Sequence, residues 1–302
     1  MNMRIYPFIV MIIFLAACTN PSSEYWKPYD ETAELQANQT HENPRMKFQL
    51  IQSKLLDKNE LWSTYEKALN RFGEDQYKAL QPLIIEQDIP TLQSHIKSGL
   101  LSYEKLTLFY LYRIRKLESD PNTTLHAILA LNPMVIEQAK AKDRQKNTQH
   151  HPIFGMPILL KDNINTQDMP TTAGAAFLQS HLPDNDAYIV SQLQAKGALI
   201  LGKVNLSEWA YYFCDGCPLG YSAVGGQTLN PYGRKVFESG GSSSGSGVAV
   251  AANYAVAAVG SETSGSILSP SGHNAVVGCK PTIGLVSRTG IVPISTTLDT
   301  AG

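Results

Sequence analysis

Residues 240–247 read GGSSSGSG, a turn-forming stretch that offers four hydroxyl groups and no side chain able to fill a core. Such a stretch fits a flexible linker, a phosphate-binding loop or a site with a catalytic serine. The apolar run SGVAVAANYAVAAVG begins within it, so a core-forming segment follows directly and argues against a linker.

Two of the remaining interpretations of this turn lack partner residues. A Walker-type phosphate loop ends in a lysine, and no lysine lies in or directly after the turn. The turn also matches the G-x-S-x-G pattern of a nucleophile elbow, with Ser243 as the nucleophile. An esterase of that kind needs an acid and a histidine downstream. His273 is the only histidine that follows, and Glu262 is the sole acid between it and the turn. Both lie close in sequence, so this alternative stays open but is disfavoured.

Two further segments carry residues that could complete a serine-based site. GMPILLKDNIN places Lys161 at the end of an apolar strand, and GSETSGSILS places Ser266 on a second glycine-rich turn. A buried lysine loses its proton more easily and can then activate a serine hydroxyl. Lys203 in LILGKVN is placed similarly, so position at a strand end does not by itself choose the base.

Together the three segments resemble the amidase signature family, which hydrolyses amides with two serines and a lysine. The resemblance covers residues 85–302, and NLSEWA, GGQTLNPY and GLVSRTGIVPISTTLDTAG are most similar to bacterial peptide amidases. It assigns the general base to Lys161, the middle serine to Ser242 and the nucleophile to Ser266. These serines are 24 residues apart, the separation that the family keeps. The resemblance therefore prefers Lys161 to Lys203.

The resemblance also implies a reaction and its supporting groups. It implies a cis Gly241–Ser242 bond, an acyl-enzyme intermediate and hydrolysis of a carboxamide to a carboxylate and ammonia, with no cofactor and no metal. Gly241 and Ser243 are expected to support the site. The expected oxyanion hole consists of Thr263, Ser264, Gly265 and Ser266. The expected substrates are small amides or C-terminal peptide amides.

The chain of 302 residues, 43% of them hydrophobic, is long enough for a sizeable core. From residue 153 short apolar runs alternate with helical stretches, which predicts an α/β fold. The resemblance implies a mixed, mostly parallel twisted sheet with helices on both faces, after an N-terminal helical segment. The predicted division is a signal peptide at 1–17, a polar tether at 18–45, a helical segment at 46–84 and an amidase signature domain at 85–302.

The N-terminal residues predict export and lipid attachment. Arg4 precedes an apolar run of the length of a signal-peptide core. The sequence LAAC ending at Cys18 resembles a bacterial lipobox, which implies lipidation of this cysteine and a membrane anchor. Thr19 after it favours the outer membrane, with the protein on the periplasmic side.

Charge and cysteine content argue against two kinds of binding partner, nucleic acid and zinc. The net charge is −1 and no basic block stands out, so nucleic-acid binding is not expected. Cys214 and Cys217 form a C-x-x-C without a second pair or a nearby histidine, so a zinc site is not predicted. In an exported protein a local disulfide is the natural alternative, although the sequence does not decide it.

The sequence departs from the family in two respects. Ser264 replaces a glycine at the nucleophile turn, and Leu268 replaces an arginine, which argues against a transamidosome subunit. The chain also stops at LDTAG where family members continue, so we expect an incomplete copy of the domain. The alternative function is therefore an inactive, truncated amidase-like lipoprotein with a binding role or none.

Overall fold

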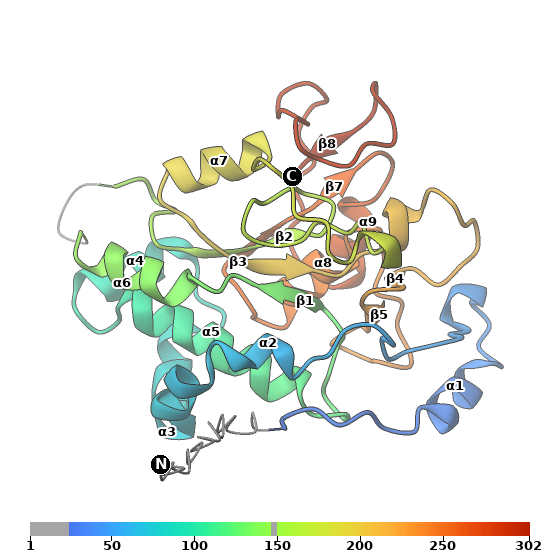
Figure 1. The fold of residues 1–302 in the computed structure, drawn as a ribbon, viewed down its shortest axis with the longest axis horizontal. Coiled ribbons are helices and arrows are strands. Elements are labelled where there is room, and N and C mark those ends of the chain that lie inside the picture. The colour runs from blue at the N-terminus through green and yellow to red at the C-terminus, as the bar shows by residue number, and fades with distance from the viewer. Residues whose placement is uncertain (1–23, 146–149) are drawn as a thin grey trace, which may run out of the picture.

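The computed structural model describes residues 24–145 and 150–302 and contains a four-stranded central sheet in the order β1-β3-β2-β6 (Figure 1). Its strands are β1 Ile128–Leu131, β2 Pro157–Lys161, β3 Leu199–Val204 and β6 Ala257–Val259. β2 runs parallel to β3 and to β6, whereas β1 runs antiparallel to β3. Every residue of β2 and β3 is buried, as expected for parallel strands covered on both faces.

Helices cover both faces of this sheet. Leu159 of β2 shares a hydrophobic cluster with Phe109 of α5 (Tyr103–Glu118) and Val248 of α8 (Ser244–Ala251). Leu160 points to the opposite face and packs in a second cluster with Val190 of α7 (Tyr188–Ala195). The fold class predicted from the sequence is confirmed.

The remaining elements surround these layers. The helices are α1 Thr32–Asn38, α2 Glu60–Ser63, α3 Glu66–Ile84, α4 Ile89–Lys97, α6 Val135–Asp143 and α9 Leu268–His273. The short strands pair as β4 Tyr221–Ser222 with β5 Gly226–Gln227, and as β7 Ser261–Glu262 with β8 Thr300–Ala301. Short 3₁₀ turns lie at Pro44–Met46, Ala176–Leu178 and Glu208–Tyr211.

The start of α5 shows how local sequence sets an element boundary. The Ser102 side chain accepts a hydrogen bond from the Lys105 N–H, which satisfies one of the free donors at the start of the helix. The helix begins directly after Ser102, and its buried face carries Leu106, Phe109 and Ile114.

The expected tether at 18–45 is wrong for its described part. Trp26 is only 6% exposed, and the ammonium of Lys58 lies 4.3 Å from the centre of its ring. The buried carboxylate of Glu31 accepts hydrogen bonds from the N–H groups of Ile51 and Gln52. A few aromatic and acidic side chains thus fix residues 24–45 to the body of the protein, in spite of their polar composition.

The segment predicted to be helical at 46–84 contains α2 and α3. Leu69 and Phe72 of α3 belong to the same hydrophobic cluster as Phe109 of α5, so this segment shares its core with the residues that follow. The predicted signal peptide at 1–17 and the predicted lipidation site at Cys18 lie outside the described residues. Within residues 24–145 and 150–302, no helix combines the length and apolarity needed to cross a bilayer.

Candidate active site

Lys161 ends β2 and is completely buried. Its Nζ donates hydrogen bonds to the Ser242 hydroxyl at 2.7 Å and to the Ser261 carbonyl at 3.1 Å. No ion pair among the described residues includes this lysine. Burial lowers the pKa of Lys161 from 10.5 to about 7, although the negative charges of Glu262 and Asp299 oppose the shift. Its amine is therefore available as a base near neutral pH.

Lys203 is the penultimate residue of β3 and is also buried, but it has different neighbours. Its Nζ lies 3.6 Å from Asp162 Oδ1 and donates to the Ile164 carbonyl at 2.6 Å and the Thr171 hydroxyl at 2.9 Å. Burial lowers the pKa of Lys203, and the carboxylate of Asp162 opposes that shift. It contacts none of the candidate serines, so the geometry separates the two lysines that strand position alone could not.

The turn that presents Ser242 requires glycine. The Gly241–Ser242 peptide bond is cis. A Cβ atom at Gly241 would lie 2.5 Å from the Ser207 hydroxyl oxygen, so no larger residue fits there without a shift. The Ser242 carbonyl accepts a hydrogen bond from the Ser207 N–H at 3.0 Å, which fixes the turn against the segment after β3. The Ser242 hydroxyl is thereby held directly beside Lys161.

Ser243 braces the site through three hydrogen bonds. Its hydroxyl donates to the Ser261 carbonyl at 3.1 Å and accepts from the Ser261 N–H at 3.2 Å. Its N–H donates to the Ser266 carbonyl at 3.0 Å. His273 lies elsewhere, with Nδ1 at 2.8 Å from the Ser269 carbonyl. The arrangement therefore gives the esterase alternative no Ser243–histidine pair.

Ser266 lies on a turn with free backbone donors. Gly265 has φ +76°, a conformation that favours glycine. None of the described residues accepts a hydrogen bond from the N–H groups of Ser264, Gly265 or Ser266. The carboxylate of Glu262 accepts from the N–H groups of the two residues after the turn, which anchors its far end. The turn can thus present backbone N–H groups to a developing negative charge.

The predicted catalytic residues are joined in two different ways. Lys161 contacts Ser242 side chain to side chain, whereas Ser266 is linked to the adjacent Ser243 through its main chain. The hydrogen bonds of the described residues include none between the hydroxyls of Ser242 and Ser266. The arrangement brings the second turn beside the first and leaves the Ser266 hydroxyl unengaged by Ser242.

Sequence reasoning missed two residues of this site. Ser261 accepts from Lys161 and Ser243 through its carbonyl, and its hydroxyl accepts from the Asn163 side-chain amide at 2.8 Å. Asn163 stands in the segment GMPILLKDNIN and Ser261 in GSETSGSILS, the segments that carry Lys161 and Ser266. Nothing in the sequence pattern indicated that the main-chain carbonyl of Ser261 would connect Lys161 with Ser243.

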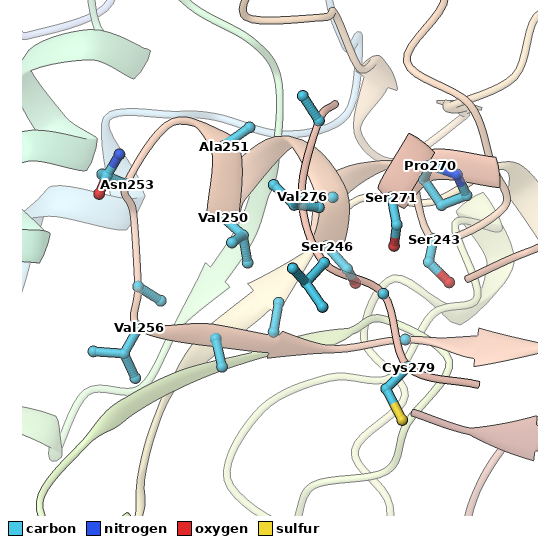
Figure 2. A pocket seen from close by; sticks show the side chains of 18 of the residues that line it. Ser243, Ser246, Val250, Ala251, Asn253, Val256, Pro270, Ser271, Val276 and Cys279 are labelled. Carbon is cyan, nitrogen blue, oxygen red and sulfur yellow. The ribbon is translucent and has the colours of Figure 1, made fainter. Parts of the chain in front are cut away.

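Two cavities are lined by the residues that flank Ser264–Ser266, Thr263 in one and Ile267 in the other. One, of about 270 Å³, is lined by Ser261, Glu262 and Thr263 together with residues 288–300. The other, of about 720 Å³, lies between α8 and β6, where Ser243 and Ser246 are among its lining residues (Figure 2). A small substrate has room on either side of the turn.

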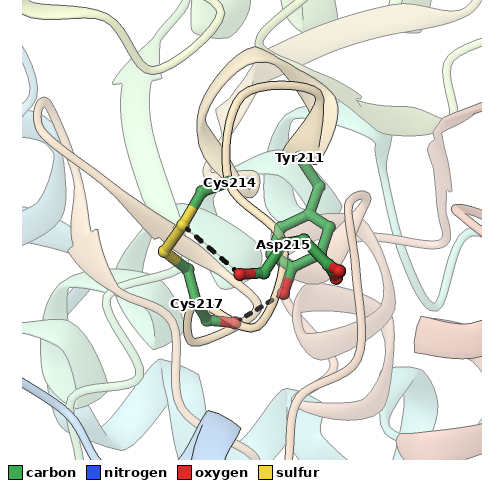
Figure 3. The surroundings of a disulfide bond; sticks show 4 residues. All are labelled: Tyr211, Cys214, Asp215 and Cys217. Atoms are coloured by element: carbon green, nitrogen blue, oxygen red, sulfur yellow. Dashed lines mark hydrogen bonds between the residues drawn. A yellow bond between two sulfur atoms is a disulfide. The ribbon is translucent and has the colours of Figure 1, made fainter.

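Cys214 and Cys217 form a disulfide, which decides the point that the sequence left open (Figure 3). The Tyr211 hydroxyl donates to the Cys217 carbonyl at 2.8 Å and connects the disulfide loop to the preceding turn. Across the described ranges, no group of three or more histidine, cysteine or acidic residues is placed to hold a metal ion.

Comparison with known proteins identifies the family. The model of the Amidase family matches residues 105–302, and the chain therefore belongs to this family, as its motifs predict. A probable amidase of Arabidopsis thaliana is 44% identical over 224 residues, which cover 72% of this chain and 43% of that protein.

Solved structures agree with this assignment. An amidase family protein from Bacillus anthracis str. Ames superposes with a TM-score of 0.79 and 41% identity, over 83% of this chain and 50% of that chain. The native peptide amidase from Stenotrophomonas maltophilia gives a TM-score of 0.69 and 49% identity, over 72% of this chain and 45% of that chain. The chain thus spans half, or somewhat less, of the length of these relatives.

Proposed function

We propose that this protein hydrolyses carboxamides through an acyl-enzyme, with Lys161, Ser242 and Ser266 as the catalytic residues. The observation that carries the proposal is the 2.7 Å contact between the buried amine of Lys161, whose pKa is lowered to about 7, and the Ser242 hydroxyl. A lysine of ordinary pKa is almost entirely protonated at neutral pH and cannot act as a base.

The proposed proton path starts at this contact. It also requires the Ser266 hydroxyl to approach the Ser242 hydroxyl when substrate is bound. Neutral Lys161 accepts the Ser242 proton while Ser242 accepts the Ser266 proton, and the Ser266 oxygen attacks the amide carbon. Collapse of the tetrahedral intermediate breaks the C–N bond, and the relayed proton leaves with ammonia. Water then attacks the ester, gives up a proton along the same path and releases the carboxylate together with the free Ser266 hydroxyl.

The expected oxyanion hole of Thr263, Ser264, Gly265 and Ser266 belongs to the same proposal. Its support is the free backbone N–H groups of the last three residues. Donors fixed before the reaction stabilise the negative oxygen of the tetrahedral intermediate, and removing one typically slows hydrolysis about 10²- to 10³-fold.

C-terminal peptide amides are the proposed substrate class. The support is the 49% identity to a protein named peptide amidase, over 72% of this chain. A primary carboxamide at the end of a peptide presents both the reacting carbonyl and a neighbouring peptide N–H.

Ammonia release from peptide amides tests the proposed function. We expect release by the unaltered protein and its loss in Ser266→Ala, with unchanged activity in the control Ser269→Ala on α9. A fluorophosphonate label should map to Ser266 by peptide mass analysis. Activity that survives both Ser266→Ala and Lys161→Ala would refute the triad, and absence of ammonia from the unaltered protein would favour the inactive alternative.

Export and lipid attachment at Cys18 form a separate proposal, with a periplasmic, outer-membrane location. It is supported by the apolar run and lipobox-like LAAC, and by the Cys214–Cys217 disulfide, because disulfides persist in oxidising compartments. Mass analysis should find a lipid on Cys18, and Cys18→Ser should release the protein from the membrane fraction, unlike the control Cys279→Ser. An unmodified Cys18 in membranes would contradict the anchor.

A further inference from the structure

A left-handed turn of aromatic residues stands near the candidate active site. Trp209, Ala210 and Tyr211 have φ angles of +51°, +53° and +72° in succession. Residues with a Cβ atom disfavour this conformation, so the surrounding structure must hold it in place. We call residues 209–213 the aromatic turn.

Contacts on both sides of the aromatic turn maintain its shape. The Trp209 N–H donates to the Ala173 carbonyl at 2.8 Å. On the other side, the Tyr211 hydroxyl donates to Cys217, in the loop that the Cys214–Cys217 disulfide closes (Figure 3). Tyr211 and the disulfide thus serve as a clamp for the turn.

The other aromatic side chains of the turn are not used in this clamp. Tyr212 is 65% exposed and Phe213 73% exposed. Their ring centres lie 5.1 Å apart, and the Trp209 ring lies 6.0 Å from Phe213 and 5.9 Å from Phe177. Exposed apolar surface gathered in this way typically marks a binding site.

This cluster forms one wall of a cavity of about 320 Å³. Its larger apolar lining residues are Trp209, Tyr212, Phe213, Val292, Pro293 and Ile294. Asn163 and residues 292–294 also line the 270 Å³ cavity beside Ser261 and Thr263, so the two hollows adjoin. The aromatic cavity therefore adjoins a cavity lined by Thr263, a residue of the proposed oxyanion hole.

An unsatisfied polar atom marks the junction of the two cavities. Asn163 is 2% exposed, and its amide nitrogen donates to the Ser261 hydroxyl. Its Oδ1 is buried and accepts no hydrogen bond from any described residue. Buried acceptors are normally paired, so a donor from a ligand is the natural partner of this oxygen.

We propose that the aromatic cavity binds a large apolar side chain next to the scissile carboxamide, while Asn163 Oδ1 accepts the adjacent peptide N–H of the substrate. This inference rests on the proposed amide hydrolysis and narrows it to amides of residues such as phenylalanine. The disulfide contributes by holding the aromatic turn at the wall of the cavity.

Ligand binding tests the inference without requiring turnover. In the Ser266→Ala protein, calorimetry compares N-acetyl-phenylalaninamide with N-acetyl-glycinamide. We expect the phenylalanine amide to bind about tenfold more tightly or better, because burying an aromatic side chain removes apolar surface from water. Trp209→Ala should reduce this preference severalfold, whereas Phe237→Ala, another exposed aromatic residue, should leave it unchanged.

Two further comparisons separate the parts of the proposal. N-acetyl-phenylalaninamide methylated on its backbone nitrogen lacks the peptide N–H. It should bind the Ser266→Ala protein more weakly than the unmethylated amide, and Asn163→Ala should remove that difference in affinity. The double variant Cys214→Ser/Cys217→Ser should lower the preference for phenylalanine. The proposed subsite is overturned if the Ser266→Ala protein binds both amides equally or binds neither at millimolar concentration. It is also overturned if Trp209→Ala leaves the preference for the phenylalanine amide unchanged. Selective binding without ammonia release by the unaltered protein overturns the proposed hydrolysis alone.

Discussion

Lys161 and Lys203 lie at the ends of neighbouring parallel strands, Lys161 as the last residue of β2 and Lys203 as the last but one of β3, and neither side chain is accessible to solvent. The register pairs Lys161 with Val204 and Lys203 with Leu160, so the two lysines are offset by one residue. Because successive side chains of a strand alternate between faces, the two amines lie on opposite faces of the sheet.

The two faces give the lysines different chemistry. Lys203 lies beside the carboxylate of Asp162, which compensates its charge, whereas Lys161 meets a hydroxyl and a carbonyl and has no paired carboxylate. A buried cation with a counter-ion keeps its proton more readily than one without. Burial lowers the pKa of both lysines, so the comparison teaches that the ion pair distinguishes the lysine that holds a counter-ion from the one that can act as a base.

Removing the Lys161 amine should have the largest effect. Lys161→Met keeps the side-chain length and deletes the base, so amide hydrolysis should fall about 10³-fold or more. Because an uncompensated amine is lost from the core, the midpoint of thermal unfolding should stay the same or rise. Initial rates of ammonia release and a thermal melt measure both. A marked loss of stability would show that Lys161 holds the fold as Lys203 does.

The matched change at Lys203 should act on stability. Lys203→Met leaves Asp162 buried without its cation, and the free energy of unfolding should fall by about 3–5 kcal/mol. Urea unfolding measures this value. The double variant Lys203→Met/Asp162→Asn should recover part of it, and failure to do so would mean that the ion pair is not the cause.

The pH dependence of Lys161 sharpens the comparison. Its pKa of about 7 in the folded protein predicts that kcat/KM rises with pH up to about 7 and then levels off. The unfolded chain keeps this proton up to its ordinary pKa of 10.5, so between these values the unfolded state binds more protons. The free energy of unfolding therefore increases as the pH rises from about 7 to 10.5, by at most about 1.4 kcal/mol per pH unit.

The Lys161→Met variant is the reference for the contribution of the Lys161 proton to the pH dependence of the free energy of unfolding. Its stability advantage over the unaltered protein should be greatest below about pH 7 and should shrink toward about pH 10. Urea unfolding at several pH values measures the difference. A difference that does not vary with pH would contradict the lowered pKa.

The smallest expected effect concerns Glu262, whose charge raises the pKa of Lys161. Glu262→Gln removes the charge and keeps an oxygen to accept from the N–H of Ile267. The rising limb of the kcat/KM profile should therefore move to lower pH, by less than about one unit. A shift to higher pH would mean that the carboxylate acts on the turn and not on the base.

The sequence predicted the parts of the site that follow a local pattern. Lys161, Ser242 and Ser266 stand in motifs whose order and spacing resemble the family, and the alternation of apolar runs predicted the sheet. Physical reasoning from the sequence alone could not decide whether Lys161 or Lys203 is the base. The two lysines are distinguished by the strand register and by the face of the sheet that carries Asp162.

Other features depend on long-range contacts that have no local pattern. Residues 24–45 look like a tether by composition, yet Trp26 and Glu31 find partners further along the chain. The role of Ser261 comes from its main chain, which any residue would supply. The aromatic turn reads as a loop in sequence, and only its backbone angles and its disulfide clamp show that it is held in one shape.

Ser261 makes its hydrogen bonds to Lys161 and Ser243 through its main chain and its hydrogen bond to Asn163 through its side chain, so only the last depends on the residue type. Its carbonyl and N–H hold the base and the brace, so those contacts survive any side chain that the backbone tolerates. Among the described residues its hydroxyl bonds only to Asn163, at the junction of the two cavities. Position 261 is therefore a place where ligand preference can be altered while the proton path keeps its support.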